Sequence, residues 1–171
     1  MIDQGRLVAG SQQARLDQFG PKILRRSRRA AIANQATFRL APRCVSFGIV
    51  NVHEGPAAAP PIFLLPGFTA SAASFADNIA GLTRHFRVVT VDLLGHGESD
   101  SPEDPAPYAP GPAMARLEDL FDHLGYGRVL LCGHSLGGAL ALRFAIERPH
   151  RLEGLIVINS SSASGTPAWR T

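Results

Sequence analysis

The chain has 171 residues, of which 45% are hydrophobic and 18% are charged, so it can bury one sizeable core and is not a disordered chain. No apolar run approaches the roughly 18 residues of a membrane span, and Cys44 and Cys132 lack metal-ligand spacing. We therefore expect no membrane segment, no metal and no disulfide framework, and we expect a reducing, cytoplasmic location. The net charge is +3, and it is unevenly distributed along the chain.

The leading segment carries the excess of positive charge. Residues 1–43 hold nine Lys or Arg residues against two acidic ones, whereas residues 44–171 hold eight basic and twelve acidic residues. The basic cluster at 25–29 (RRSRR) has no aromatic neighbour for base stacking and no apolar stretch typical of a secretion signal. We expect residues 1–35 to form a basic, disordered leader, with a targeting segment or a nucleic-acid patch as alternatives. We expect no nucleic-acid function.

Short apolar runs bounded by turn residues predict the strands of a buried sheet. The expected strands are a half-exposed one at 44–52, buried ones at 62–65, 88–91 and 129–132, and a further apolar one at 155–158. Apolar residues at helical spacing predict helices at 74–84, 113–124 and 136–147. Five prolines predict irregular structure at 101–112. Continuous apolar strands that alternate with helices indicate an α/β fold, a mostly parallel sheet with helices on both faces.

The segment 133–137 (GHSLG) lies between a predicted strand and a predicted helix, which is the context of a nucleophile elbow. A tight strand-to-helix turn would project the hydroxyl of Ser135 above the sheet. Gly133 and Gly137 provide the space that lets neighbouring chain segments approach. The N-terminus of the following helix offers free N–H groups to a developing oxyanion. Ser135 is therefore the candidate nucleophile.

The loop 66–69 (PGFT), directly after the strand 62–65, is the candidate for the rest of an oxyanion hole. An acyl-transfer site needs two N–H donors aimed at the oxyanion. The Leu136 N–H is next to the nucleophile, and we choose the Phe68 N–H as the second donor. His134 and Thr69 are candidates for the substrate pocket. The alternative for this loop is a plain Pro-Gly turn.

Three motifs in order, 65–68 (LPGF), 92–99 (DLLGHGES) and 133–137, resemble the N-terminal two-thirds of an α/β-hydrolase domain. The resemblance covers about residues 45–165. It implies that Ser135 attacks an acyl carbon, that a histidine takes its proton, and that an acid orients this histidine. For Asp92 and His96 it implies a turn-stabilising role. Pro66 stands where many family members have a histidine.

The same resemblance implies that the triad is incomplete in this chain. The family's acid follows its sixth or seventh strand and its histidine follows the eighth, whereas 155–158 corresponds to the sixth. The residues after it contain no Asp, Glu or His, and His150 precedes it. We expect residues 36–171 to form a partial domain, truncated at the start of the lid region, with little activity alone. The sixth strand would then be an exposed apolar edge.

For the reaction, we expect hydrolysis of a carboxylic ester or a similar acyl or C–C bond in a small molecule, without a cofactor. One alternative is the branch of menaquinone-pathway lyases that eliminate pyruvate (SHCHC synthase-like), although Ala139 stands where those enzymes usually have an arginine. A cofactor-free haloperoxidase-like enzyme and a non-catalytic pseudo-hydrolase also remain open. Haloalkane dehalogenases need an aspartate in place of Ser135. The sequence indicates neither the substrate nor the oligomeric state.

Overall fold

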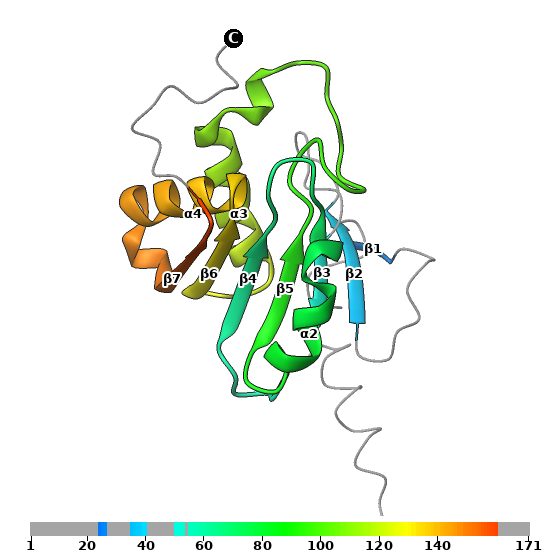
Figure 1. Ribbon diagram of the computed structural model, residues 1–171, viewed down its shortest axis with the longest axis vertical. Coiled ribbons are helices and arrows are strands. Elements are labelled where there is room, and N and C mark those ends of the chain that lie inside the picture. The colour runs from blue at the N-terminus through cyan, green and yellow to red at the C-terminus, as the bar shows by residue number, and fades with distance from the viewer. Residues whose placement is uncertain (1–23, 27–34, 41–49, 54, 161–171) are drawn as a thin grey trace, which may run out of the picture.

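The computed structural model describes residues 24–26, 35–40, 50–53 and 55–160, which form a sheet of seven strands in the order β1-β2-β3-β5-β4-β6-β7 (Figure 1). The strands are β1 (Leu24–Arg26), β2 (Gln35–Leu40), β3 (Val50–His53), β4 (Pro61–Leu65), β5 (Arg87–Val91), β6 (Val129–His134) and β7 (Leu152–Ile158). The α-helices are α2 (Ala76–Leu82), α3 (Pro110–His123) and α4 (Leu136–Glu147). Three short 3-10 helices lie at Ala72–Phe75, Ala106–Tyr108 and Pro149–Arg151.

The sheet is mixed, and its parallel half positions the site. Strands β1, β2, β3 and β5 pair antiparallel in turn, whereas β5, β4, β6 and β7 are parallel neighbours. The carboxyl ends of β4, β5, β6 and β7 therefore meet at one edge of the sheet. Ligands of open α/β sheets bind at this edge, because the loops after successive strands converge there.

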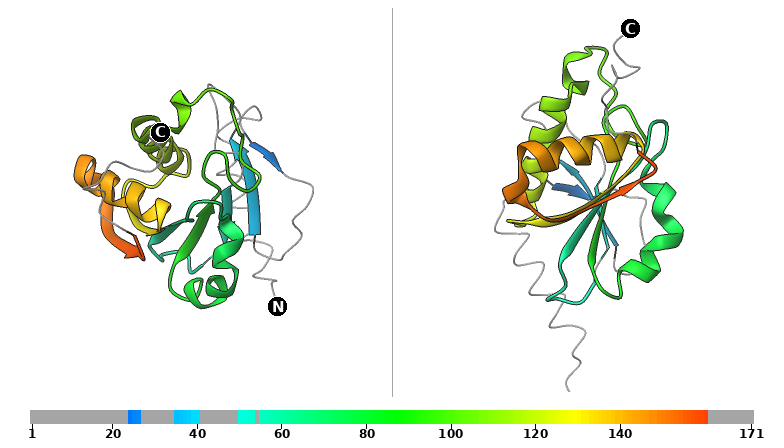
Figure 2. Two further views of the ribbon diagram at one scale, coloured as in Figure 1. Left: turned by 45° about the horizontal axis from the view of Figure 1, so that its top comes forward. Right: turned by 60° about the vertical axis from the view of Figure 1, so that its left-hand side comes forward.

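Helices cover both faces of the sheet, as the continuous apolar strands predict. Helix α2 lies on one face, while α3 and α4 lie on the other (Figure 2). The α3–α4 side holds the larger core, where Phe121 packs edge-on against Phe63 and Phe144, with ring centroids 4.5 and 5.5 Å away. The α2 side holds a smaller core around Ile62 and Phe75. Burial on both faces explains why β4 and β5 contain no alternation of polar and apolar residues.

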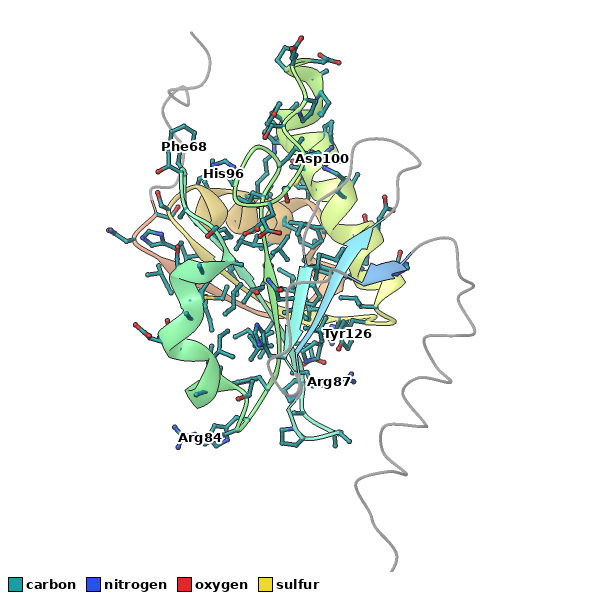
Figure 3. All side chains as sticks on the ribbon, turned by 90° about the vertical axis from the view of Figure 1, so that its right-hand side faces the viewer. Phe68, Arg84, Arg87, His96, Asp100 and Tyr126 are labelled. Atoms are coloured by element: carbon teal, nitrogen blue, oxygen red, sulfur yellow. The ribbon has the colours of Figure 1, made fainter. Side chains whose placement is uncertain are left out.

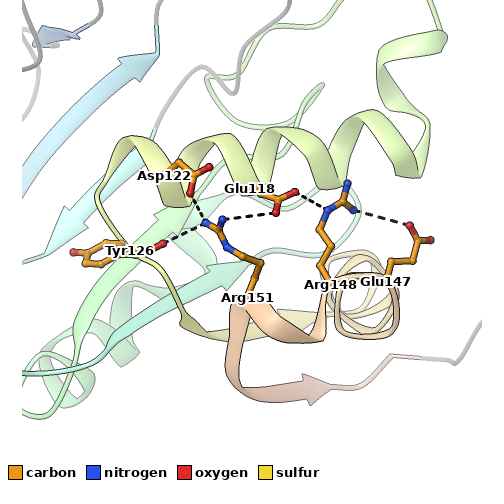
Figure 4. A network of polar contacts seen from close by, with 6 residues as sticks. All are labelled: Glu118, Asp122, Tyr126, Glu147, Arg148 and Arg151. Atoms are coloured by element: carbon orange, nitrogen blue, oxygen red, sulfur yellow. Dashed lines mark hydrogen bonds and ion pairs between the residues drawn. The ribbon is translucent and has the colours of Figure 1, made fainter.

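An ion-pair network ties α3 to the chain after α4 (Figure 4). Arg148 Nε donates to Glu118 at 2.7 Å, and Arg151 donates to Asp122 at 2.5 Å and to the carbonyl of Tyr126 at 3.3 Å. The side chains of Arg148 and Arg151 are largely buried, so these bonds fix the approach to β7 more firmly than exposed pairs would.

Helix α3 begins earlier than the proline content predicts. Residues 110–112, expected to be irregular, form its first turn, with Pro110 at the first helical position. The first N–H groups of a helix have no intrahelical acceptor, so a proline there loses no hydrogen bond, and its fixed φ suits the helix. The 3-10 helix Ala106–Tyr108 orders a further part of the same stretch.

The N-terminal expectations are only partly covered by the described residues. Strand β1 lies within 1–35, so residues 24–26 of the expected disordered leader instead pair with β2. Residues 1–23 and 27–34 lie outside the described residues. Of the strand expected at 44–52, residues 50–52 belong to β3, where burial alternates as predicted, and 44–49 lie outside the described residues.

Strand β7 ends the described sheet and exposes apolar side chains. Ile156, Val157 and Ile158 keep 44%, 36% and 43% of their surface exposed, whereas the strands β4 and β5 at the centre are almost fully buried. Within residues 24–160, no described strand pairs with the outer edge of β7. The predicted exposed apolar edge is thus present at the strand where we expected it.

Candidate active site

Ser135 occupies a strained turn between β6 and α4. Its backbone angles are φ 49° and ψ −114°, in the positive-φ region that a residue with a side chain rarely adopts. Neighbouring segments approach too closely for any side chain at two flanking positions. A Cβ on Gly133 would lie 2.3 Å from the carbonyl oxygen of Gly137, and a Cβ on Gly137 would lie 2.4 Å from that of Leu65. The strain is therefore imposed by tight backbone packing on both sides of Ser135.

Backbone hydrogen bonds from β7 and α4 hold the strained residue. The Ser135 N–H donates to the carbonyl of Ile158 at 3.0 Å, which extends the pairing of β6 with β7. The Ser135 carbonyl accepts the Ala139 N–H at 3.0 Å and the Ser160 hydroxyl at 2.7 Å. Ser135 itself is partly exposed and lies at the carboxyl edge of the sheet.

The loop after β4 lies against this turn. The Gly137 N–H donates to the Pro66 carbonyl at 3.1 Å. A Cβ on Gly67 would lie 3.2 Å from Ser135 Cβ and 2.9 Å from His134 Nδ1, so Gly67 packs on both residues. The structure thus brings together the two segments that were predicted from the sequence to form an oxyanion hole. The N–H of Leu136, the first residue of α4, has no acceptor within its own helix.

Two side chains of this loop, those of Phe68 and Thr69, point outward. Phe68 is 71% exposed, and its ring stands edge-on to the His96 ring with centroids 5.7 Å apart (Figure 3). Thr69 is exposed and has a positive φ of 59°. His134 is partly exposed and lies against Gly67. Of the two side chains expected to line a substrate pocket, that of His134 thus contacts Gly67, whereas that of Thr69 is exposed.

The loop after β5 is organised by one carboxylate. Asp92 is 5% exposed, and its two oxygens accept the Ala72 N–H at 2.7 Å and the Glu98 N–H at 3.0 Å. The Ser99 hydroxyl donates to the Asp92 carbonyl at 2.6 Å. Gly97 has φ +55°, and a Cβ there would lie 2.3 Å from Asp92 Oδ2. Asp92 therefore stabilises its own loop and also anchors the segment that follows the Phe68 loop, a link that local sequence patterns do not reveal.

Other nucleophiles and bases near the turn are less suited to catalysis. Burial raises the pKa of the Cys132 thiol, so it stays protonated and is a poor nucleophile. His96 Nδ1 lies 2.9 Å from the Leu94 carbonyl, within its own loop. His150 lies in the 3-10 helix at the amino end of β7, at the edge of the sheet opposite Ser135. Residues 55–160 place no histidine after the elbow at the carboxyl edge.

The described residues contain no group of three or more His, Cys, Asp or Glu side chains arranged to hold a metal ion. No helix among them is long and apolar enough to cross a membrane.

A mixed α/β sheet with a strained serine between a parallel strand and its helix defines the class of α/β-hydrolase proteins. The family model of the alpha/beta hydrolase fold matches residues 60–171. The chain therefore belongs to the α/β-hydrolase family, as the three sequence motifs indicated.

Similar proteins include enzymes of several activities. A candidate 2-succinyl-6-hydroxy-2,4-cyclohexadiene-1-carboxylate synthase of Bacillus subtilis is 36% identical over 120 residues, which are 69% of this chain and 41% of that protein. Epoxide hydrolase 4 of Mus musculus is 36% identical over 108 residues, 63% of this chain and 30% of that protein. A carboxylesterase structure from Bacillus subtilis has a TM-score of 0.61 at 30% identity and covers 72% of this chain and 42% of that one. The chain thus spans less than half the length of these relatives.

Proposed function

We propose that this chain is the nucleophile-bearing part of a serine-dependent hydrolase that acts on a carboxylic ester or a similar acyl or C–C bond of a small molecule. The observation that carries the proposal is the strained Ser135 (φ 49°) at the carboxyl edge of the sheet, packed against the Gly67 loop. The likeness to a carboxylesterase structure supports the ester class. The free, buried Cys132 supports a reducing, cytoplasmic location.

In the proposed reaction, Ser135 Oγ attacks the acyl carbon, and the former carbonyl oxygen becomes an oxyanion. The Leu136 N–H at the start of α4 and the Phe68 N–H of the neighbouring loop bind this oxyanion. Such preorganised donors are worth about 10²–10³-fold each in turnover. The positive end of the α4 dipole adds to the same stabilisation.

We further propose that the 171 residues alone carry little activity. An acid and a histidine are needed to take the proton of Ser135, and at the carboxyl edge Asp92 and His96 bond to backbone groups instead. Loss of the base of such a triad lowers turnover by about 10⁴–10⁶-fold. The 171-residue chain, assayed alone, is thus expected to be near background.

The test uses the protein expressed from its natural locus, assayed with p-nitrophenyl butyrate. We expect saturable hydrolysis that Ser135→Ala abolishes. Ser101→Ala, which removes an exposed hydroxyl in another loop, is the matched control and is expected to hydrolyse at the wild-type rate. Hydrolysis that survives Ser135→Ala would exclude Ser135 as the nucleophile.

A second candidate is a pyruvate-eliminating lyase, which the Bacillus subtilis synthase relative favours. Ala139, in the first turn of α4, is the residue that argues against it, because its methyl group offers no positive charge to an acidic substrate. Release of pyruvate from an enolpyruvyl-substituted precursor of the succinyl-cyclohexadiene carboxylate, followed by a coupled lactate dehydrogenase assay, distinguishes the two. Absence of both activities would favour a non-catalytic pseudo-hydrolase.

A further inference from the structure

The hydroxyl of Ser160 bonds to the nucleophile's own carbonyl. Ser160 lies two residues after β7, and its Oγ donates to the Ser135 carbonyl oxygen at 2.7 Å. The same carbonyl accepts the Ala139 N–H at 3.0 Å, so both acceptor positions of this oxygen are used. Two donors from different elements, the loop after β7 and the first turn of α4, thus fix the direction in which this carbonyl points.

The direction of that carbonyl sets the direction of a proposed oxyanion donor. The Ser135 carbonyl and the Leu136 N–H belong to one peptide unit, which is planar and trans, so the two bonds point in opposite directions. Any rotation of the carbonyl away from Ser160 rotates the Leu136 N–H by the same angle. A hydrogen bond to the carbonyl also polarises the peptide and strengthens its N–H as a donor.

The contact is built by the residues on both sides of it. Asn159 has a positive φ of 46°, which turns the chain at the end of β7 back toward the elbow. On α4, a Cβ at Gly138 would lie 2.6 Å from Ser160 Cβ and 2.9 Å from its Oγ. Gly138 therefore leaves the space that Ser160 occupies, and a Cβ there would also lie 2.9 Å from the carbonyl oxygen of Gly133 in the elbow.

We propose that Ser160 is a positioning residue for the oxyanion hole: its hydroxyl holds the Ser135–Leu136 peptide so that the Leu136 N–H faces the oxyanion. This role rests on the proposed function of Ser135. Ser160 touches neither the substrate nor the Ser135 hydroxyl in this scheme. Its contribution is made in the transition state, when charge develops on the oxygen that the Leu136 N–H binds.

The experiment compares Ser160→Ala with Ser99→Ala in the protein expressed from its natural locus. Both substitutions delete one serine hydroxyl that donates to a backbone carbonyl, at 2.7 and 2.6 Å, but the Ser99 bond lies in the loop after β5. The measurements are kcat and KM for p-nitrophenyl butyrate, the rate of labelling by a fluorophosphonate probe, and the thermal midpoint. Rates are normalised to the folded fraction seen by circular dichroism.

For Ser160→Ala we expect kcat and the labelling rate to fall about tenfold with KM unchanged, the pattern of an interaction made only in the transition state. For Ser99→Ala we expect a lower thermal midpoint and unchanged kcat. A kcat of Ser160→Ala within about twofold of wild type, or a change in KM alone, would overturn the positioning role while leaving Ser135 as the nucleophile. Wild-type protein that neither hydrolyses the ester nor takes the label would overturn the proposed function, and the role of Ser160 with it.

Discussion

Two turns at the carboxyl edge of the sheet, the elbow after β6 and the loop after β5, are held in different ways. At the elbow, backbone segments approach so closely that Gly133 and Gly137 cannot carry a side chain, and most of the hydrogen bonds join backbone to backbone. In the loop after β5, three backbone bonds are joined by two bonds that the Asp92 carboxylate accepts from N–H groups. The elbow is thus specified by the absence of side chains, and the loop by the Asp92 carboxylate together with the absence of a side chain at Gly97.

The largest expected effect follows from adding a side chain at the elbow. Gly137→Ala places a Cβ 2.4 Å from the Leu65 carbonyl oxygen and 2.5 Å from that of Pro66, and both belong to backbone that cannot move alone. We expect a loss of about 3 kcal/mol or more of unfolding free energy, measured by urea denaturation. Gly111→Ala in α3, where a Cβ meets nothing within 4 Å, is the control and should leave stability equal or higher. A Gly137→Ala protein as stable as wild type would refute the tight packing of the elbow.

Removing the side chain that holds the second turn has the next largest effect. Asp92→Ala leaves the N–H groups of Ala72 and Glu98 without their acceptor, at a cost of about 2–3 kcal/mol in unfolding free energy. Asp92→Asn keeps one oxygen that can accept one of these two N–H groups, so it should retain part of the stability. Its NH₂ group is a donor and cannot accept the other N–H. Equal stability of both variants and wild type in denaturant would contradict the role of Asp92 as the anchor of this loop.

The pH dependence of the unfolding free energy is expected to come from two half-buried histidines outside both turns. Burial lowers the pKa of His53 on β3 and of His123 at the end of α3 below 6.5, so the unfolded chain takes up protons more readily. Their contribution to stability is complete above pH 6.5 and is lost as the pH falls below that value toward the folded-state pKa. The unfolding free energy should therefore decline as the pH falls below 6.5, and less so in a His53→Gln, His123→Gln double variant. An equally steep decline in that variant would assign the acid sensitivity to other groups.

The smallest effect is expected at a pair far from both turns. Arg143 and Glu147 form an ion pair of 2.7 Å on α4 with 55% and 41% of their side chains exposed. Arg143→Ala should cost about 0.5 kcal/mol or less and lose even that in high salt. Glu118→Gln, which weakens the more buried bond to Arg148, should cost more. Thermal unfolding of the two variants measures the stability that each loses. A larger loss in Arg143→Ala than in Glu118→Gln would show that exposure does not determine the strength of these ion pairs.

The two turns also differ in how far they could be predicted from sequence. The elbow is formed by residues that are adjacent in sequence, since its strand, its Gly-x-Ser-x-Gly turn and its helix all lie within 129–147. It can therefore be predicted without knowledge of the fold. The buried strands of the parallel half can also be predicted from sequence, because each is a continuous apolar run. The link from Asp92 to Ala72 spans 20 residues, and the bond from Ser160 to Ser135 spans 25.

Both long-range contacts depend on strand order, which local patterns do not contain. Because β4 lies between β5 and β6, and β7 lies beside β6, the loops after these strands become neighbours only in the assembled sheet. The early start of α3 was missed for a different reason, since prolines such as Pro110 break helices in the interior and suit them in the first turn. The polar residues 159–160, directly after the strand beside the elbow strand, were the signal available for the Ser160 contact.

Covalent labelling shows whether Ser135 is the nucleophile. The protein expressed from its natural locus is treated with a fluorophosphonate probe, and the adduct is located by mass spectrometry of its peptides. We predict one adduct, on Ser135, formed at a saturable rate and absent from Ser135→Ala. An adduct on another residue, or labelling that persists in Ser135→Ala, would show that Ser135 is not the nucleophile.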